Sequence, residues 1–576
     1  NTAVGSVALV ANTTGASNVA VGLSALTANT TAANNTAVGK NAMAANTTGA
    51  NNVAVGMNAL DANTTAANNV AVGVSSLGTN TTGASNTAIG DSALFANTTA
   101  SNNTAVGINS LGANTTGDLN VAVGREAMKD NTTGSENTGI GRNALAANTT
   151  AANNTAVGAL ALTANTTGTN NVATGHRALI TNTTGGNNVA VGASALAAHT
   201  TGNDNAALGS GALASNTTAS NNAAVGKGSL LLNTTGASNS ALGQAALAAN
   251  TTGAQNTAVG KSALAANTTA NNNTGVGTSA LVSNTTGTQN TAVGDAAGDA
   301  ITTGSQNTFI GFNAAGAATT GTLNSFLGRS SGSAMTTGSK NTLIGSYNGN
   351  QNSLDLRTSS NNVILSDGDG NGRFRASADG QIVVGDSIQS YGGGGYTGTG
   401  FTVNQDSNDY NAAFRTNTST AGSAYGIFVH YPSCTPNTTQ NNFITCNDAS
   451  ANRFQVRSNG GVANFQSNDA NLSDERVKKD ISLLGSMWGK FKAIEIVNFK
   501  YKDQTHEDFN IGVIAQQLES VAPEFIDNSG FGETPEGEDP LKAVFTSDLY
   551  HATIKALQEA MTRIETLEAK VASLES

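Results

Sequence analysis

The chain is dominated by a repeat of 17 residues that continues without an insertion or a deletion. Glycine recurs at this interval from Gly5 and Gly22 to Gly345, which gives 21 copies of a unit close to N-T-A-V-G-x-x-A-L-x-A-N-T-T-G-x-x. Asparagine stands four residues before this glycine in every copy, and a threonine pair fills each of the 20 intervening segments. Coils of constant length stack with the same residue at the same point of every turn, so this spacing predicts a solenoid.

The repeat unit favours short strands over helices. The T-A-V segment alternates in the manner of a short strand, the glycine after it suits a turn with positive φ, and N-T-T-G offers a second turn. A helical turn over S-A-L-x-A is the weaker alternative, because Asn, Thr and Gly are poor helix formers. A disordered low-complexity segment is the other alternative, and it would need neither constant spacing nor apolar residues in register.

Three residue types of the repeat are expected to point inward. These are the valine of the strand (Val4, Val21), the leucine or methionine that follows it (Leu26, Met43) and the asparagine before the strand. One inward asparagine per coil would form a ladder in which each amide binds the next coil, as in cross-β stacks. The N-T-T segments also match the N-glycosylation sequon, for which a simple turn is the favoured interpretation. We therefore predict a mainly β protein whose residues 1–345 form a parallel β-roll shaft.

The N-T-A-V-G and N-V-A-V-G strings resemble the N-S-V-A-I-G signature of trimeric autotransporter head domains. The resemblance covers residues 1–345, although the period is longer than that of the usual head repeat. It implies a left-handed parallel β-roll that assembles as a homotrimer. A roll filled mainly by Ala, Val and Leu has a small core of its own, and burial against two neighbouring copies would enlarge it.

Charge and hydropathy argue against two classes of partner. The net charge is −11, and residues 473–576 hold 19 of the 37 acidic and 11 of the 26 basic residues, so the repeats are nearly neutral. Without a basic stripe, we expect no nucleic-acid partner. No apolar run approaches the roughly 18 residues of a membrane span, so we expect no membrane insertion. The chain begins at Asn1 within a repeat, without Met or a signal peptide, which we interpret as a fragment or a processed form.

Residues 346–385 depart from the 17-residue pattern and are predicted to form a β-rich neck of short strands. This segment contains the first four residues of a D-x-D-x-N-G calcium loop: Asp367, Asp369, Asn371 and Gly372. Ala378 stands where such a loop needs its last acidic ligand. A tight hairpin turn is therefore the favoured interpretation, and a metal site is the alternative. We expect no metal and no cofactor elsewhere, since no carboxylate recurs in register along the coils.

Residues 386–472 concentrate aromatic residues that the repeats lack and contain the strand-like runs AYGIFVHY, NNFITC and NRFQVR. We predict a small β-rich distal domain, a possible receptor-binding tip for a host cell-surface glycan or protein. Its aromatic side chains could stack on a glycan or could fill the domain's own core. Cys434 and Cys446 could be bridged or could be free buried thiols. Asp386, Asp406 and Asp409 form no recognisable pair of catalytic carboxylates.

The segment L-S-D-E-R-V-K-K-D-I separates this region from residues 473–576, whose composition is that of an ordinary globular domain. Ser473 is followed five residues later by Lys478, and no histidine stands near it. A serine hydroxyl is a weak nucleophile until a base accepts its proton. Lys478 could be that base if burial, or the neighbouring cations Arg476 and Lys479, lowered its pKa. Ser473 would then attack the carbonyl carbon of Leu472, its own preceding peptide.

This segment is followed in order by FKAIEIVNFKYK, IGVIAQQLESVAPEFI and SDLYHATIKALQEAMTRIETLEAKV. The whole of residues 473–576 resembles the endosialidase-type intramolecular chaperone domain at the C-termini of phage tail spikes and fibres. The resemblance implies a single self-cleavage between Leu472 and Ser473, with Ser473 as nucleophile and Lys478 as base, and no turnover of an external substrate. Asp474 and Arg476 match the family motif and would position the loop, or form a purely structural pair.

The chaperone-like domain is predicted to be α+β and to end in a helix over about residues 549–576. Its heptad positions are apolar: Leu557, Ala560, Ile564, Leu567, Val571 and Leu574. This spacing is typical of a coiled coil, and the resemblance implies three strands.

Together these features predict a structural and adhesive phage tail fibre, extracellular on the virion, assembled as a homotrimer by a self-cleaving chaperone. The alternatives are a bacterial trimeric surface adhesin and a glycan-degrading tailspike.

Overall fold

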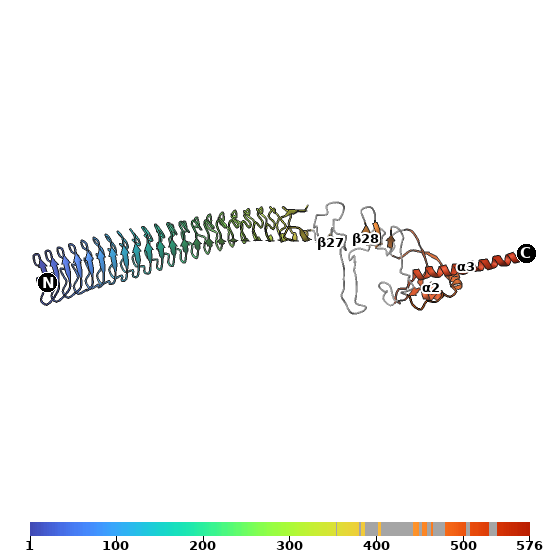
Figure 1. Cartoon of the computed structure of the whole chain (residues 1–576), viewed down its shortest axis with the longest axis horizontal. Coiled ribbons are helices and arrows are strands. Elements are labelled where there is room, and N and C mark those ends of the chain that lie inside the picture. Colours follow the sequence, from blue (N-terminus) through green and yellow to red (C-terminus); the bar gives the residue numbers. More distant parts are fainter. Residues whose placement is uncertain are drawn as a thin grey trace. The chain divides into compact units, whose positions relative to one another are not determined.

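The computed structural model describes residues 1–352, 354–378, 382–385, 401–404, 442–447, 452–457, 462–464, 478–502, 507–528 and 538–576. They fall into two compact units, residues 1–413 and residues 414–576, and each is considered by itself. Figure 1 shows the repeats of the first unit as a stack of coils and the last residues of the second unit as a long helix.

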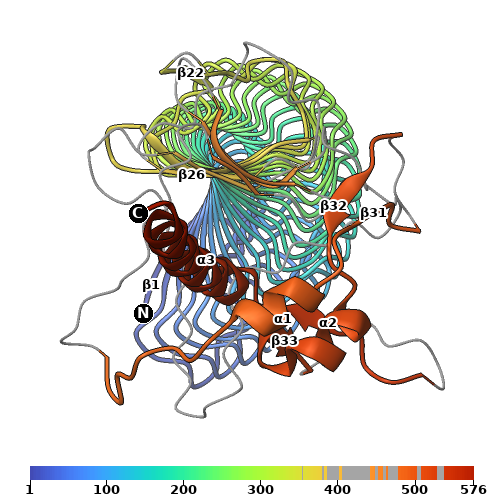
Figure 2. The same ribbon diagram turned by 90° about the vertical axis from the view of Figure 1, so that its right-hand side faces the viewer.

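Every repeat contributes one three-residue strand, and consecutive strands begin 17 residues apart. They run from β1 (Thr2–Val4), β2 (Val19–Val21) and β3 (Thr36–Val38) to β20 (Ser325–Leu327) and β21 (Thr342–Ile344). Neighbouring strands pair in parallel and in register, so that Thr2 lies opposite Val19. Viewed along the stack, each coil is turned slightly relative to the one before it (Figure 2), as expected for a twisted parallel sheet. The predicted mainly β solenoid of 17-residue repeats is confirmed.

The middle alanine of each strand fills the interior, and the prediction that the valines point inward is wrong. Ala20 is fully buried, whereas Val19 and Val21 are only partly covered. Side chains alternate between the two faces of a strand. Since Asn18 points inward and is buried, Val19 must point outward, Ala20 inward and Val21 outward. The asparagine and the valine of N-T-A-V are three residues apart, so they lie on opposite faces of the strand.

The leucine or methionine of each repeat lies in the core as predicted, on a turn that is not helical. Leu26 and Met43 are fully buried. Leu26 has a φ of 51° and Ser24 a φ of 58°, both in the left-handed region. The N–H group of Leu26 donates to the carbonyl oxygen of Ala42 in the next coil, at 3.0 Å. The weaker helical alternative for this segment is therefore wrong.

Two ladders of buried asparagine run through the shaft. In the first, the N–H of Asn35 donates to Oδ1 of Asn18 (2.9 Å), and its own Nδ2 donates to the carbonyl of Gly49. This is the predicted ladder. The second uses the asparagine of N-T-T: Nδ2 of Asn46 donates to Oδ1 of Asn29 at 3.0 Å. Satisfied amides can be buried at low cost, and a buried Asn46 cannot accept a glycan in the folded shaft.

The last coils replace the core alanine by phenylalanine and lose the leucine at the same time. Phe309 and Phe326 are buried, with ring centroids 5.4 Å apart. A Cβ at Gly332 would lie 2.5 Å from the Phe326 ring, and one at Gly298 would lie 2.7 Å from the Phe309 ring. The larger aromatic residue thus occupies the space that leucine fills in other coils, which conserves core volume.

The neck continues the stack and then reverses direction. It contains β22 (Asn350–Gln351), β23 (Leu354–Asp355), β24 (Val363–Ser366), β25 (Gly372–Ala376) and β26 (Ile382–Gly385). Strand β26 pairs in parallel with β27 (Phe401–Asn404), which lies beyond the predicted end of the neck at residue 385. Strand β24 pairs in parallel with β21 of the shaft, and β24, β25 and β26 are antiparallel neighbours. The prediction of short strands joined by turns is confirmed.

The second unit holds one small sheet and the C-terminal α+β region. The sheet consists of β28 (Asn442–Asn447), β29 (Asn452–Arg457) and β30 (Val462–Asn464) and is antiparallel. Strands β28 and β29 confirm two of the predicted runs. The third run, AYGIFVHY, lies outside the described residues. The same is true of Cys434 and of the three carboxylates Asp386, Asp406 and Asp409.

The C-terminal region is α+β and ends in a long helix, as predicted. Its elements are α1 (Trp488–Ala493), β31 (Val497–Phe499), β32 (Asn510–Gly512), α2 (Ala515–Val521), η2 (Pro523–Phe525), β33 (Ile526–Asp527), β34 (Ala543–Val544) and α3 (Thr546–Glu575). A small core joins them, formed by Met487, Leu518, Ala522, Phe525, Ile526, Ala552 and Ala556. Within the described ranges, no helix is both long and apolar enough to cross a membrane.

His199 interrupts the second asparagine ladder. Its Nε2 lies 2.8 Å from the carbonyl oxygen of Gly202, and its Nδ1 lies 3.0 Å from Nδ2 of Asn216. Only a neutral ring with its proton on Nε2 satisfies both partners. Oδ1 of Asn182, one coil earlier, is buried without a partner because the histidine offers it no donor. Burial lowers the pKa of His199 from its ordinary 6.5, and the Gly202 carbonyl opposes this effect.

We therefore expect the shaft to lose stability as the pH falls below about 6.5. As the pH falls, His199 takes up a proton in the unfolded chain at a higher pH than in the folded one. Its contribution to the free energy of unfolding is therefore complete above pH 6.5 and is lost as the pH falls towards the lowered pKa of the folded state. The substitution His199→Asn should abolish this step and stabilise the shaft by about 1–3 kcal/mol, since it gives Asn182 a donor. Thermal unfolding followed by circular dichroism from pH 8 to 5 tests this. The exposed His176→Asn is the control, and an equal change there would contradict the assignment.

Candidate functional site

The predicted self-cleavage site is only partly covered by the structure. Leu472, Ser473, Asp474 and Arg476 lie outside the described residues, and the cut stays a prediction. Lys478 is described and is exposed. A lysine becomes a useful base when it is buried or crowded by other cations. Activation of Lys478 would therefore require cover from another part of the chain or from another copy.

The segment after the predicted cut is fixed to the long helix α3 through Glu559. This carboxylate accepts hydrogen bonds from the Ser486 hydroxyl (2.9 Å) and from the backbone N–H groups of Met487 (3.2 Å) and Trp488 (3.0 Å). Desolvation opposes ionisation here, but these three bonds outweigh it and lower the pKa of Glu559. The Arg563 guanidinium lies 4.6 Å from the centre of the Trp488 ring. The start of α1 is thereby fixed on α3.

Sequence reasoning missed this attachment. Glu559 is an ordinary polar position of the helix, and Trp488, the one tryptophan of the chain, is the only signal that a specific contact forms there.

The heptad positions of α3 are exposed in the single chain. Leu557 is 60% exposed, Ile564 53%, Leu567 60% and Val571 52%. At the base of this strip lies a hollow of about 520 Å³, lined mostly by apolar side chains: Trp488, Phe491, Lys492, Thr553, Ala556, Leu557 and Ala560. Contiguous exposed apolar surface of this kind is typical of an interaction site. The helix has the predicted extent, while a coiled coil requires other copies of the chain.

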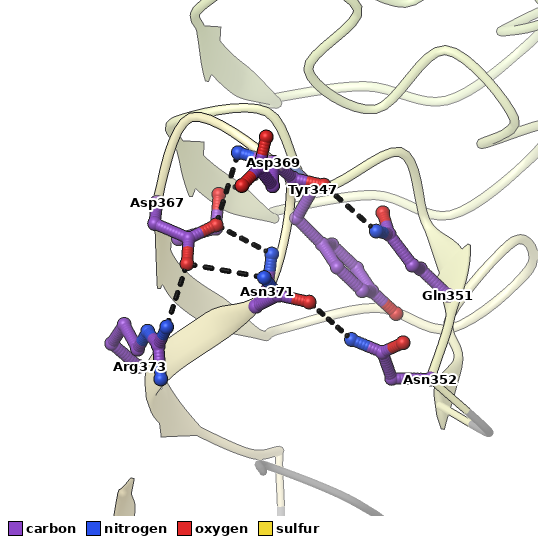
Figure 3. A network of polar contacts seen from close by, with 8 residues as sticks. Tyr347, Gln351, Asn352, Asp367, Asp369, Asn371 and Arg373 are labelled. Atoms are coloured by element: carbon purple, nitrogen blue, oxygen red, sulfur yellow. Dashed lines mark hydrogen bonds and ion pairs between the residues drawn. The ribbon is translucent and has the colours of Figure 1, made fainter. Parts of the chain in front are cut away.

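The calcium-like segment of the neck is a hairpin turn between β24 and β25 (Figure 3). Oδ1 of Asp367 accepts hydrogen bonds from the N–H groups of Asp369 (3.1 Å) and Asn371 (2.8 Å). Its Oδ2 accepts from Nδ2 of Asn371 (3.2 Å) and from the Arg373 guanidinium (2.8 Å). The amide of Asn352, on the neighbouring turn, donates to Oδ1 of Asn371.

These contacts give Asp367 a structural role. The backbone hydrogen bond from Asn371, with further bonds from the Asn371 side chain and Arg373, lowers the pKa of Asp367 to about 2. Both carboxylate oxygens are held by N–H donors, and a guanidinium beside them would repel a cation. The predicted hairpin turn is confirmed.

Comparisons with known proteins find a family domain and a phage relative. The family model described as chaperone of endosialidase matches residues 473–527, which include Ser473 and Lys478. A probable tail fiber protein of Escherichia phage Phieco32 is 32% identical over 116 residues, which cover 20% of this chain and 16% of the phage protein. The matched part thus spans about one sixth of that relative's length. No solved structure matches the chain.

Proposed function

We propose that this chain, whose residues 473–527 belong to the chaperone-of-endosialidase family, is a trimeric phage tail fibre that adheres to a host cell surface. It would be part of the virion and extracellular. The observation that carries the proposal is the order of the parts. A shaft of uniform coils precedes a family domain described as a chaperone. The match to a phage tail fibre protein supports the same assignment.

An apolar strip on the shaft supports association of several copies. The outward residue at the end of many strands is an exposed Val, Ile or Leu: Val4, Val55, Ile89, Ile140, Leu208, Val225, Leu242, Val293, Ile310, Leu327 and Ile344. Because the strands are in register, these residues form one row along the sheet. Such a row is too long and too regular for scattered surface residues, and burial against the same row of other copies would remove it from water.

The exposed heptad strip of α3 supplies the means of bringing copies together early. The parallel pairing of successive coils is expected to form slowly, since loop closure must precede each non-local β contact. A coiled coil folds from local contacts and would hold three C-termini side by side while the coils form. The shaft could then close in register from that end.

Self-cleavage would make the assembled fibre kinetically stable. Oγ of Ser473 would attack the carbonyl carbon of Leu472 while Lys478 accepts the hydroxyl proton. The peptide C–N bond then breaks, the freed amine takes up a proton, and the resulting ester is hydrolysed by water. Once residues 473–576 have been released, the fibre has lost the element that guides its assembly, and unfolding becomes irreversible.

Two other functions remain as alternatives. A bacterial trimeric adhesin would share the roll, but the match to the chaperone family and to a phage protein favours the fibre. A tailspike that degrades glycan would release new reducing ends from host polysaccharide, whereas an adhesive fibre would bind without releasing any. An assay of reducing ends with the purified protein distinguishes the two.

Substituting Ile564→Asp and Leu567→Asp together should convert the trimer to monomers or to aggregated chains. Two charges per helix would have to be buried in the heptad core, at a cost of several kcal/mol per copy. Every protein in this comparison carries Ser473→Ala, so that the helix is not cleaved off. Sedimentation equilibrium then measures the mass of the assembled particle. Glu565→Lys changes the charge outside the heptad core and should remain trimeric. The proposal would be refuted if the chain without the two aspartate substitutions were a monomer.

A further inference from the structure

Phe95 is the one aromatic residue among residues 1–308, and it is 44% exposed. It occupies the position after the core leucine of its coil. The same position holds glycine in the coil before, Gly78, and in the coil after, Gly112. Among the first 20 coils, only one other has glycine there, Gly316. An exposed aromatic ring with a gap on either side is unlike the rest of the shaft surface.

The two gaps differ. A Cβ at Gly78 would lie 3.1 Å from the Phe95 ring, so the ring leans over Gly78 and covers it. The atoms nearest to a Cβ at Gly112 would be backbone atoms of Asn109, at 3.4 Å or more. The space above Gly112 is therefore open. It forms a notch of about 350 Å³, and its main lining residues are Ser92, Phe95, Asn109, Gly112, Lys129 and Asp130.

The notch has a firm backbone and available polar groups. Hydrogen bonds between successive coils hold its floor: the N–H of Ala96 donates to the carbonyl of Gly112, and the N–H of Ala113 donates to that of Lys129, both at 3.0 Å. The polar side chains of Asn109, Lys129 and Asp130 point to no partner within the described shaft and remain able to bind a ligand.

We propose that this notch, the Phe95 notch, binds one or two neutral sugar residues of a surface glycan. The open ring of Phe95 offers an apolar face for the C–H groups of a pyranose. The amide of Asn109, the ammonium of Lys129 and the carboxylate of Asp130 offer both donors and acceptors for its hydroxyls. Lys129 and Asp130 carry opposite charges, so these two lining residues together bring no net charge to the notch. Its volume is at the lower end for ligand sites, which suits a small part of a glycan chain.

The notch lies on the shaft, away in sequence from the possible tip at residues 386–472, and requires neither cleavage nor the tip. It refines the proposed adhesive function by naming a site and a ligand class. A failure of the sugar site can be told from a failure of the proposed fibre function, because notch variants should still be cleaved and should still be trimeric.

The test uses the full-length protein and saturation-transfer NMR with neutral oligosaccharides of glucose, galactose and N-acetylglucosamine. We expect weak binding by at least one sugar. Phe95→Ala should weaken it on the order of tenfold, since stacking contributes about 1–1.5 kcal/mol. Gly112→Leu should abolish it by filling the notch, at a position where Leu231 is accommodated in another coil.

Leu231→Ala, at the equivalent position of a distant coil, is the matched control and should bind as wild type. Unchanged thermal unfolding shows that each variant is folded. Binding of no sugar, or binding that is unaffected in both notch variants, would overturn the proposal. Selective binding of AMP, tested in parallel as a flat aromatic ligand, would also overturn the sugar assignment.

Discussion

Ser473→Ala should leave the chain intact, whereas the wild-type protein should separate into residues 1–472 and residues 473–576. The alanine variant has no hydroxyl to attack the carbonyl of Leu472, so the first bond of the cleavage cannot form. The effect is expected to be all or none, because uncatalysed peptide hydrolysis is negligible during expression and purification. Denaturing gel electrophoresis and intact mass measurement of both proteins give the result directly.

Three further variants separate the chemistry from folding. Lys478→Arg keeps the positive charge but cannot lose its proton, so it should also remain uncut. Lys479→Arg, next to it, should be cut normally. Ser486→Ala removes a serine that contacts Glu559 and should be cut as well. Equal masses for the wild type and Ser473→Ala would refute the assignment of the nucleophile, and cleavage of Lys478→Arg would refute that of the base.

The shaft could be predicted from the sequence because constant spacing is a direct consequence of stacking. It was harder to predict which side chains of the strand face the interior. Asn18 and Val21 were both expected to point inward, yet residues three apart in a strand lie on opposite faces, and the buried residue of the strand is Ala20. The second ladder was missed because N-T-T-G was assigned to a turn, although Asn29 is buried as completely as Asn18.

Elements that depend on a local sequence pattern could be predicted, whereas contacts between distant segments could not. The heptad of α3 and the hairpin at Asp367 are local patterns, and the structure contains both elements. The hydrogen bonds that Glu559 accepts from Ser486 and Trp488 join residues about 70 positions apart. Nothing in either segment alone signals such a partner. Ser473 was predicted as the nucleophile from its neighbours in sequence, and the cleavage experiment tests its pairing with Lys478.

Gly107→Ala should destabilise the shaft far more than Gly112→Ala, although both add one methyl group to the same coil. Gly107 has a φ of 132°, and a Cβ there would lie 2.6 Å from the backbone of Gly124 in the next coil. Neither the strained φ at residue 107 nor the close contact with Gly124 can be relieved unless the two coils move apart. We expect a cost of about 3 kcal/mol or more from the strained φ and the lost stacking.

Gly112 is the internal control, because its Cβ would meet nothing closer than 3.4 Å. Alanine there should change stability by less than about 0.5 kcal/mol. In a solenoid each coil contacts only its neighbours, so Gly107→Ala should open the shaft locally. Hydrogen exchange measured by mass spectrometry should increase in the coils next to residue 107 and stay unchanged in distant coils. Equal unfolding temperatures for the two variants would mean that close approach of the glycine backbones does not hold the coils together.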